Sequence, residues 1–317
     1  MFEIRRYSAD RADEWNQFVA QSKNGTFLFD RGYMDYHADR FDDHSLMCYL
    51  DGSLYAILPA NRREKTLFSH QGLTYGGLVM TDEATTAKIC TLFDEINDFL
   101  RAEGIERVVY KPVPRVFHSL PSDEDLYAIF LRCRAKLVGR KVSSAVVPQR
   151  PVKWKRYRRY AANKGRHDGI EVHQTNDFKA FWTILTDNLA QKHDAKPVHT
   201  LEEIALLHRR FPKNIQLWAA FAQTGEMLGA TVMYVGEHFA HTQYMSASDE
   251  GKRLRAMDVL IDHLLHEVFP KVDFFDFGTS NLPEGNELHE SLIYQKEGFG
   301  GRAVCYDTYE WDVWSVK

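Results

Sequence analysis

The 317-residue chain is 44% hydrophobic and 26% charged, which supplies enough apolar side chains for two cores of ordinary size, so two domains are expected. A net charge of −4 and a pI near 6.4 exclude a general nucleic-acid coat protein and a molecule whose whole surface binds membranes. Any site for a polyanion must therefore be local, and DNA is not an expected partner.

The N-terminal segment MFEIRRYSADRADEW lacks the apolar core of a signal peptide, and no window approaches the roughly 18 apolar residues of a spanning helix. We therefore expect a cytoplasmic protein without a membrane span. The cysteines Cys48, Cys90, Cys133 and Cys305 lie far apart and form no C-x-x-C pair. They are expected to be buried free thiols rather than disulfides or zinc ligands.

The first half of the chain predicts an alternation of helices and strands. Its expected elements are a helix from Trp15, a hairpin over 46–58, a strand ending near Gly77, a helix over 84–101 and a strand over 106–113. Asp51-Gly52 supplies the turn of the hairpin, because this dipeptide favours a tight two-residue connection.

The second half repeats this order roughly 170 residues later. Its expected elements are a helix from Trp182, a hairpin over 217–235 with its turn at Thr224-Gly225, a strand ending near Ser248, a helix over 254–268 and a strand over 272–280. Such a repeat predicts two copies of one α/β unit, in which the sheet begins antiparallel and ends with a helical crossover. We expect an N-terminal domain of residues 1–150 and a C-terminal domain of residues 151–317.

Between the halves lies a basic segment, residues 150–166, with eight Lys or Arg and no acidic residue. Pro148 and Pro151 mark a break at its start, and Gly165 and Gly169 mark another at its end, so a bridging helix is expected between them. The segment is compatible with a solvated helix face, and also with a surface for an anionic substrate or for the phosphates of a carrier.

The stretch SASDEGKRLRA, residues 246–256, places Gly251 and several cations directly before an apolar helical stripe. A helix start offers unpaired backbone N–H groups to a diphosphate, although a plain capped helix start fits the spacing equally well. The single glycine excludes a Walker loop, and the strand-like residues after GFGG (298–301) exclude a dinucleotide fingerprint. The matching helix start of the first copy is acidic and is expected to bind phosphate poorly.

The order strand, loop, helix and strand, followed by NELHESLIYQKEGF (286–299), resembles the acyl-CoA site of GCN5-related N-acetyltransferases. In that superfamily the loop after the fourth strand holds the coenzyme A pyrophosphate, and a later helix commonly carries a tyrosine before Gly-Phe. The tandem copies look like the Fem-type branch, which includes aminoacyl and acyl transferases acting on cell-wall and surface-glycan precursors. HDAKPVHTLEEI, DFGTSN and QKEGFGGR look similar to segments of bacterial N-acetyltransferases of this branch. The loop lacks the Q/R-x-x-G-x-G/A pattern, which leaves both coenzyme A and aminoacyl-tRNA open as acyl carriers.

The resemblance implies roles for individual residues. The donor site would consist of Ser248, Gly251, Lys252, Arg253, Leu254, Arg255 and Ala256. Tyr294 would protonate the leaving thiolate, although core packing with its hydroxyl at the rim fits equally. Lys296 would place a cation near the reacting carbonyl, although it also fits a helix C-terminus. The candidate bases are Glu287, His241 and Asp276, and His241 also fits a hydrogen-bonded core residue.

Thr200 and Glu203 have the spacing of a capping box, so a helix is expected to start there, and residues 192–199 before it are expected to form a loop. The superfamily binds its acceptor there, although polar loop residues are often only solvated. The candidate acceptor contacts are Lys192, His193, Lys196, His199, Gln243, Thr279 and Asn281. The histidines lack a matching carboxylate pattern, so no metal is expected.

We therefore expect an α/β fold with mixed sheets, made of two tandem acetyltransferase-like domains, and an N-acyltransferase whose cleft lies mainly in the second. The donor would be acetyl-CoA or another acyl-CoA, and the acceptor an amine of a small molecule such as a nucleotide-linked amino sugar or a surface-glycan precursor. The first copy would be a scaffold or the acceptor-side wall. One alternative is transfer from aminoacyl-tRNA to a peptidoglycan precursor, and another is a non-catalytic binding module of the same fold.

Overall fold

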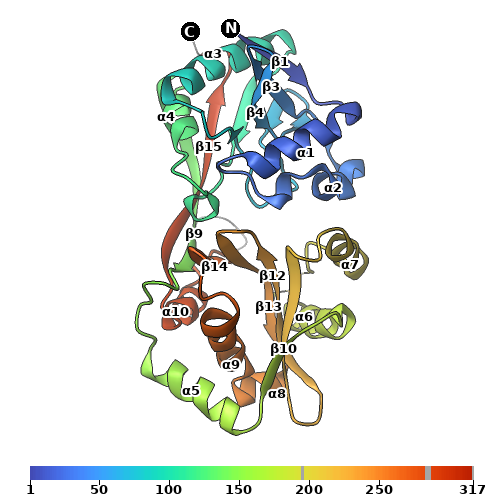
Figure 1. Ribbon diagram of the computed structural model, residues 1–317, viewed down its shortest axis with the longest axis vertical. Helices are drawn as coiled ribbons and strands as arrows, with labels where there is room; N and C mark the ends of the chain where they lie inside the picture. The colour runs from blue at the N-terminus through green and yellow to red at the C-terminus, as the bar shows by residue number, and fades with distance from the viewer. Residues whose placement is uncertain (194–195, 283–286, 316–317) are drawn as a thin grey trace. The chain divides into compact units, whose positions relative to one another are not determined.

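The computed structural model describes residues 1–193, 196–282 and 287–315, and the chain forms two compact units (Figure 1). Of the described residues, unit 1 holds 1–141 and 305–315, and unit 2 holds 142–282 and 287–304. The boundary between the units is not the single division at residue 150 that the sequence predicts. The strands β9 (Lys136–Val146) and β15 (Arg302–Asp312) both run from one unit into the other.

Unit 1 contains two groups of paired strands and several helices. The helices are α1 (Ala12–Gln21), α2 (Arg31–Met34), α3 (Thr86–Ala102) and α4 (Glu124–Leu131), and the strands besides β9 and β15 are β1 (Phe2–Arg6), β2 (Asp42–Asp43), β3 (Leu46–Leu50), β4 (Ser53–Leu58), β5 (Asn61–Arg63), β6 (Thr66–Phe68), β7 (Val79–Met80) and β8 (Arg107–Tyr110). One sheet has the order β1-β3-β4-β7, and the remaining strands of the unit follow the order β15-β8-β6-β5-β2. The predicted hairpin is confirmed, with φ angles of 51° and 82° at Asp51 and Gly52.

The core of unit 1 forms around α3, whose buried stripe packs on the sheet. Phe93 on α3 contacts Tyr110 of β8 and Trp311 of β15 edge-on, and the rings of Tyr110 and Trp311 meet at a tilt. The indole Nε1 of Trp311 donates to the Asn97 side chain at 2.9 Å. These contacts bury the C-terminal strand in unit 1, which explains why it lies with that unit.

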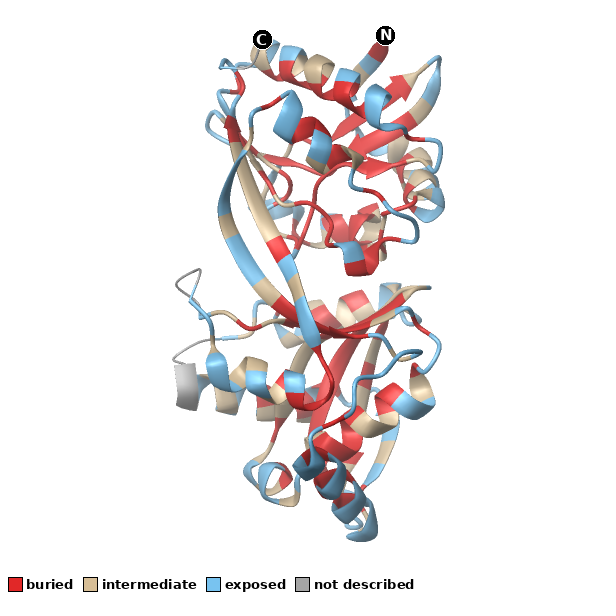
Figure 2. Cartoon of the chain, turned by 90° about the vertical axis from the view of Figure 1, so that its left-hand side faces the viewer, coloured by how far each residue is buried: buried red, intermediate tan, exposed pale blue. Residues whose placement is uncertain are grey.

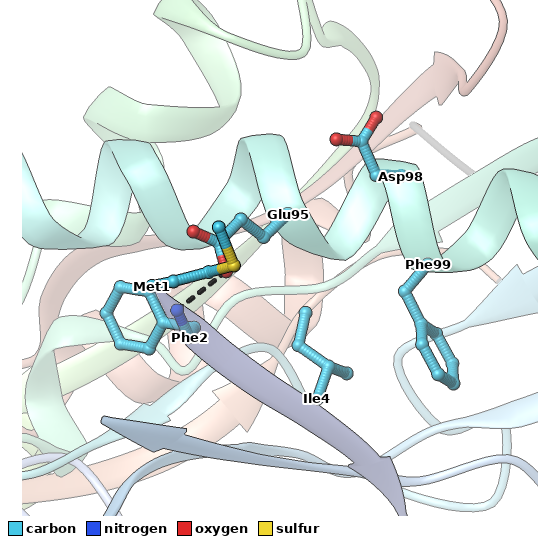
Figure 3. A pocket seen from close by; sticks show the side chains of 6 residues that line it. All are labelled: Met1, Phe2, Ile4, Glu95, Asp98 and Phe99. Carbon is cyan, nitrogen blue, oxygen red and sulfur yellow. Dashed lines mark hydrogen bonds between the residues drawn. The ribbon is translucent and has the colours of Figure 1, made fainter. Parts of the chain in front are cut away.

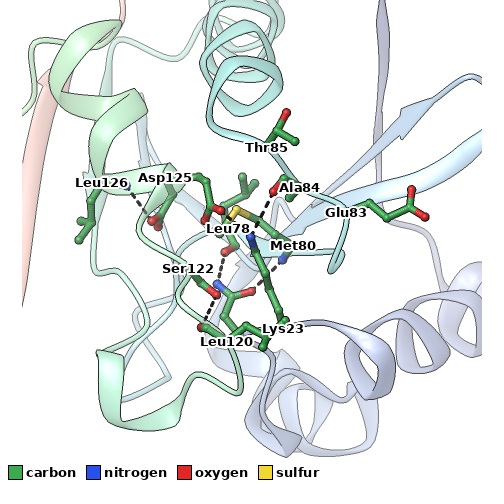
Figure 4. Close-up of polar contacts among 12 residues, drawn as sticks. Lys23, Leu78, Met80, Glu83, Ala84, Thr85, Leu120, Ser122, Asp125 and Leu126 are labelled. Atoms are coloured by element: carbon green, nitrogen blue, oxygen red, sulfur yellow. Dashed lines mark hydrogen bonds and ion pairs between the residues drawn. The ribbon is translucent and has the colours of Figure 1, made fainter.

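A buried lysine, Lys23, joins the loop before α3 to the start of α4 in unit 1 (Figure 4). The Nζ atom of Lys23 donates to Glu124 at 2.7 Å and to the carbonyl of Ala84 at 3.3 Å. The next residue, Asn24, donates to the Leu78 carbonyl and accepts from the Met80 backbone N–H. These hydrogen bonds compensate the buried charge of Lys23, and they give Lys23 and Asn24 a structural role in unit 1.

Unit 2 has one mixed sheet with helices on it. The helices are α5 (Arg156–His167), α6 (Phe178–His193), α7 (Leu201–Arg210), α8 (Asp249–Leu254), α9 (Ala256–His263) and α10 (Glu290–Gly298), and the strands besides β9 and β15 are β10 (Glu171–Thr175), β11 (Ile215–Phe221), β12 (Met227–Val235), β13 (Phe239–Ala247) and β14 (Phe274–Thr279). The order is β10-β11-β12-β13-β14-β9, antiparallel except for the parallel pair β13 and β14. In Figure 2 most residues of the central strands are buried, while the helices have exposed outer faces.

The predicted helix of the basic segment is present as α5, but it starts only at Arg156, and Gly165 lies inside it rather than at a break. The helix packs on α9 through its small residues. A Cβ atom on Gly165 would lie 2.4 Å from a methyl of Val259, so only glycine permits this approach. Arg158 is buried and its Nη1 donates to Asp258 at 2.8 Å. The contacts therefore fix α5 on the core of unit 2.

Most of the predicted elements are confirmed. The capping box is present, because Thr200 accepts from the Glu203 N–H and the Glu203 carboxylate accepts from the Thr200 N–H. The prediction of a strand that ends near Gly77 is wrong, since residues 69–78 form a loop. The strand that pairs with β4 in this region is the short β7, which follows the loop. His70 and Gly77 have φ angles of 64° and 83°, and such left-handed backbone interrupts an extended strand.

Two further expectations are wrong. Residues 249–254 form helix α8 rather than a loop, because Ser248 caps a helix that starts directly after β13. Cys48, Cys90 and Cys133 are buried free thiols as predicted, but Cys305 is exposed, because the first residues of β15 face solvent. Throughout the described ranges, each helix is too short or too polar to cross a membrane.

Candidate functional site

The parallel strands β13 and β14 of unit 2 pair over a short distance and then part. Their register joins Phe239 with Phe274, Ala240 with Phe275 and His241 with Asp276. In the described part of unit 2, no further backbone pair joins them, although β13 continues to Ala247 and β14 to Thr279. Within the described residues, β13 therefore has no strand partner on this side beyond His241, and we call this part of β13 the open edge.

A β-bulge lies at this point of β13. Val232 of β12 pairs with Tyr244 and Met233 pairs with Thr242, so Gln243 is an extra residue in β13. A bulge bends its strand and increases the local twist. It thus gives a local cause for the separation of β13 from β14.

His241, Asp276 and Ser143 form a buried hydrogen-bonded chain at the point of separation. The Nδ1 atom of His241 lies 2.7 Å from Asp276 Oδ2, and the Ser143 hydroxyl donates to Asp276 Oδ1 at 2.5 Å. Asp276 is fully buried and His241 is 7% exposed. A buried carboxylate needs several donors, and these two contacts supply them from β13 and β9.

Gly278 connects this chain to Lys296. Its backbone N–H donates to Asp276 at 3.0 Å, and its carbonyl accepts from Lys296 Nζ at 2.8 Å. Lys296 also donates to the Thr279 carbonyl at 2.8 Å. Burial lowers the pKa of Lys296 to about 8, and the neighbouring Asp276 opposes this shift. The structure therefore brings together three of the predicted catalytic candidates, His241, Asp276 and Lys296.

Unit 1 has a counterpart of the parallel pair without the ionisable groups. Strands β6 and β8 also pair over three positions, which end at Phe68 and Val109 where unit 2 has His241 and Asp276. Beyond them, the loop 69–78 covers the edge of β8.

Several hydrogen bonds hold this loop on β8 and on Lys111, the residue that follows β8. The Gly76 N–H donates to the Lys111 carbonyl at 2.9 Å, and the Leu78 N–H donates to the Tyr110 hydroxyl at 2.7 Å. Lys111 Nζ donates to the Leu73 carbonyl at 2.8 Å. The first copy thus fills with its own chain the position that the second copy leaves open.

The predicted donor residues lie on α8 and at the start of α9. The Ser248 hydroxyl accepts from the Gly251 N–H, and a Cβ atom on Gly251 would lie 1.9 Å from the Leu228 carbonyl oxygen. Close packing of α8 on β12 therefore explains the glycine. Leu254 is half-buried and Ala256 is buried. Whether any of these residues contact a donor stays a prediction.

The three cations of this segment have different surroundings. Lys252 pairs with Asp249 at 2.7 Å, and Arg253 pairs with Glu250 of the same helix. Arg255 is exposed, has a left-handed backbone with φ of 63°, and has no ion-pair partner within the described residues. Arg255 is therefore the cation of this segment most available to an external anion.

Tyr294 and Lys296 occupy different sides of α10. Residues that are two positions apart on a helix are separated by roughly 200° about its axis. Tyr294 is 57% exposed and its ring stacks on Tyr157 of α5 at a centroid distance of 6.3 Å, whereas Lys296 is 4% exposed. Tyr294 is thus outside the buried chain that contains His241.

Within the described residues, the predicted acceptor residues do not form one cluster of contacts. His199 is buried rather than solvated, and its Nδ1 lies 2.6 Å from the Tyr244 hydroxyl of β13. The Asn281 side chain accepts from the Val142 N–H at 2.8 Å. The remaining acceptor candidates are Lys196, which is exposed, Gln243 and Thr279, which are half-buried, and Lys192 and His193. The last two end α6 rather than lying in a loop, and their side chains are outside the described residues. Glu287, a predicted base, is exposed.

The basic segment presents an exposed cationic face. Of its eight cations, Arg158, Lys164 and Arg166 pair with Asp258, Asp168 and Asp262. The other five are exposed and have no ion pair within the described ranges: Arg150, Lys153, Lys155, Arg156 and Arg159. Tyr157 and Tyr160 of the same helix are 41% and 69% exposed.

A cavity of about 300 Å³ lies in unit 1 (Figure 3). Its lining consists of Met1, Phe2, Ile4, Glu95, Asp98 and Phe99. The Glu95 carboxylate accepts from the Phe2 backbone N–H at 2.7 Å. None of the residues predicted to bind donor or acceptor line it. Over the described residues, no group of three His, Cys, Asp or Glu side chains is arranged to hold a metal ion.

Ser143 is the member of the buried chain that the sequence pattern does not single out. It lies on β9, about 100 residues before His241 in the chain, and no local motif contains it. Its contact depends on the antiparallel pairing of β9 with β14, in which Ser143 pairs with Thr279. Sheet order, which a single sequence does not show, is the information that would identify it.

No protein-family model and no curated protein matches the chain. Solved structures match over nearly its whole length. FemX superposes with a TM-score of 0.68 at 10% identity, covering 98% of this chain and 97% of that one. L-PGS from Bacillus licheniformis has a TM-score of 0.62 at 11% identity, with 96% and 92% covered. A tandem GNAT protein from the clavulanic acid biosynthesis pathway has a TM-score of 0.53 at 11% identity, with 99% of both chains covered.

At such low identities the similarity establishes the fold. The predicted α/β class with mixed sheets is confirmed, and so is the tandem arrangement of acetyltransferase-like domains. The chain therefore has a tandem acetyltransferase-like fold, similar to that of FemX.

Proposed function

We propose that the chain is an N-acyltransferase that uses acetyl-CoA or another acyl-CoA and that its donor site lies in unit 2. The observation that carries this proposal is the separation of β13 and β14 directly beyond the His241–Asp276 pair. The acceptor would be an amine of a small molecule, such as a nucleotide-linked amino sugar or a surface-glycan precursor. A soluble acyl-CoA donor fits a cytoplasmic location.

The open edge in mid-sheet suits the donor chemically. Unpaired backbone N–H and C=O groups of a strand pair readily with an extended chain that carries amides. The pantetheine arm of coenzyme A is such a chain. Its pyrophosphate would then lie near the end of β13, where Ser248, Lys252, Arg253 and Arg255 follow. In unit 1 the loop 69–78 occupies the matching edge, which supports unit 2 as the donor-binding copy.

The buried residues fit the steps of acyl transfer. The amine nitrogen attacks the thioester carbonyl carbon while His241 takes the amine proton. Lys296, with two of its three N–H groups bound to carbonyls, would direct the third toward the developing oxyanion. The C–S bond then breaks, and the proton held by His241 returns to the leaving thiolate. No covalent enzyme intermediate is required.

The test combines binding and turnover with the full-length protein. Coenzyme A should raise the melting temperature, because a ligand that binds only the folded state stabilises it. Acetyl-CoA with a panel of amines, including nucleotide-linked amino sugars, should release free thiol. His241→Gln and Lys296→Met should each reduce this release at least about 100-fold while preserving the fold. Stabilisation by coenzyme A without turnover of any amine would favour a non-catalytic binding module.

A second candidate function is transfer from aminoacyl-tRNA to a peptidoglycan precursor. The exposed cations of residues 150–159 support it, because phosphate contacts need such groups. Binding of tRNA should then weaken steeply with salt, and Lys155→Glu with Arg156→Glu should abolish it. Arg209→Glu with Arg210→Glu on α7 makes the same change in charge and is the matched control. Stabilisation by tRNA but not by coenzyme A would select this alternative.

A further inference from the structure

The geometry points to Ser143 and Asp276 as positioning residues that set the tautomer of His241, so that Nδ1 carries the proton and Nε2 is the basic nitrogen. This inference rests on the proposed function, since it specifies how His241 would serve as the base. It gives Ser143 a positioning role, and it makes Asp276 a positioning residue rather than the catalytic base.

With Asp276 ionised, its hydrogen bonds have a fixed sense. An ionised carboxylate can only accept, so the 2.7 Å contact between His241 and Asp276 requires a proton on Nδ1. In a neutral imidazole the lone pair is then on Nε2. The alternative tautomer would place two lone pairs against each other in a buried site. Burial of Asp276 makes this alternative costly.

Ser143 and Gly278 fix the carboxylate itself. The Ser143 hydroxyl binds Asp276 Oδ1, while the Gly278 N–H and His241 bind Oδ2. Both oxygens are therefore held, and the plane of the carboxylate cannot rotate without breaking a buried hydrogen bond. Three different strand segments must come together for this arrangement, which local packing of a single core histidine does not need.

Other polar groups also surround His241. Tyr234 of β12 lies with its ring centroid 6.4 Å from that of His241, and Lys296 of α10 binds the carbonyl of Gly278. A Cβ atom on Gly278 would lie 3.3 Å from His241 Cε1, so the backbone of β14 closes one side of the ring. Asp276 contacts the ring directly through its carboxylate.

The chain offers a matched control in a second His–Asp pair between the same two regions. His238 Nδ1 lies 3.2 Å from Asp273 Oδ2, and their side chains are 37% and 54% exposed. Because both side chains are this exposed, water can hydrogen-bond to one of them when the other is substituted. Asp273→Asn therefore makes the same chemical change as Asp276→Asn, a few residues away and outside the buried chain.

The first experiment measures kcat/KM. In Asp276→Asn it should fall at least about tenfold, because an amide no longer holds the proton of His241 on Nδ1. Ser143→Ala should lower kcat/KM less, and Asp273→Asn should leave it unchanged.

The second experiment reads the tautomer directly by ¹⁵N NMR of histidine-labelled protein, with the His241→Gln spectrum for assignment. The neutral ring of His241 should carry its proton on Nδ1 in the wild type and in Asp273→Asn. Asp276→Asn should populate the Nε2-protonated form. A wild-type ring protonated on Nε2, or an Asp276→Asn spectrum and kcat/KM identical to the wild type, would overturn the inference.

The two experiments separate this inference from the proposed function. If no acyl-CoA and amine pair reacts, the acyltransferase proposal fails while the NMR spectra still decide the tautomer. If transfer occurs but the tautomer does not depend on Asp276, the acyltransferase proposal stands and the positioning roles are lost. Should Asp276→Asn fail to fold, Ser143→Ala gives the same comparison in milder form.

Discussion

The carbonyl of Gly278 accepts a hydrogen bond from Lys296 Nζ at 2.8 Å, in a backbone conformation with φ of 71°. The left-handed conformation turns the strand where β14 has parted from β13. It thereby lets one residue contact both Asp276, through its N–H, and Lys296, through its carbonyl. The backbone at Gly278 therefore links the stability of unit 2 to the arrangement of its buried polar groups.

Gly278→Ala should destabilise the protein beyond the cost of its backbone conformation. A left-handed alanine costs about 1–2 kcal/mol, and here its Cβ would also lie 3.3 Å from the His241 ring. Gly104→Ala is the matched control, because Gly104 has the same φ of 71° and a Cβ atom there would meet nothing within 4 Å. Urea unfolding should show the larger loss for Gly278→Ala. Equal losses would mean that the ring moves away freely.

Lys296 should produce the basic limb of the pH–rate profile. Burial lowers its pKa to about 8, so an ammonium that stabilises the oxyanion is lost as pH rises through that value. The rate should therefore fall above about pH 8. Lys296→Arg, if active, should keep its charge and move the decline to higher pH. A decline at the same pH in both proteins would assign it to another group.

His70 should make the protein sensitive to acid. Burial lowers its pKa to about 3 in the folded state, against a usual value of 6.5, so the unfolded chain binds more protons between these values. This stability is present above pH 6.5 and is lost as the pH falls, by about 2 kcal/mol at pH 5. His70→Asn, which tolerates the left-handed backbone, should reduce the loss in urea unfolding. Exchange of the exposed His167 for Asn should leave it unchanged.

The buried Arg158–Asp258 pair should matter more to stability than the exposed pairs of α5. Removing one partner of a buried ion pair leaves the other charge uncompensated, which costs about 3–5 kcal/mol. Arg158→Leu is therefore expected to lower the unfolding free energy by about 3 kcal/mol. Lys164→Ala, which removes an exposed pair with Asp168, should cost less than about 1 kcal/mol. Comparable effects would contradict the structural role given to Arg158.

Arg255 should contribute more to donor binding than Lys252 or Arg253. The latter two already pair with Asp249 and Glu250 on α8, so a phosphate must compete with those carboxylates. Isothermal titration with coenzyme A should show a larger loss of affinity for Arg255→Ala than for the double exchange of Lys252 and Arg253. Unchanged affinity in all these variants would place the pyrophosphate elsewhere.

Patterns within short segments predicted much of the fold. The stripes of α3 and α9, the turn at Asp51-Gly52 and the capping box at Thr200 are local, and each forms as expected. The loop 69–78 was not predictable in this way. Its apolar residues resemble a strand, but left-handed backbone and contacts with β8 determine its path.

The site was predictable only in part. His241, Asp276 and Lys296 stand near recognisable segments, and the structure brings them together. Ser143 and the separation of β13 from β14 depend on sheet order and register, which connect distant parts of the chain. Gly251 is a local signal with two explanations, because a phosphate site and close packing on Leu228 both favour a glycine at this position.

Hydrogen exchange of backbone amides, measured with and without acetyl-CoA, tests the central claim most directly. If the donor binds along the open edge of β13, amides of residues 242–247 should exchange more slowly when acetyl-CoA is present. The matching region of unit 1, residues 69–78, should be unaffected because its own hydrogen bonds already occupy the edge of β8. Unchanged exchange at 242–247, or protection at 69–78 instead, would contradict a donor site between β13 and β14.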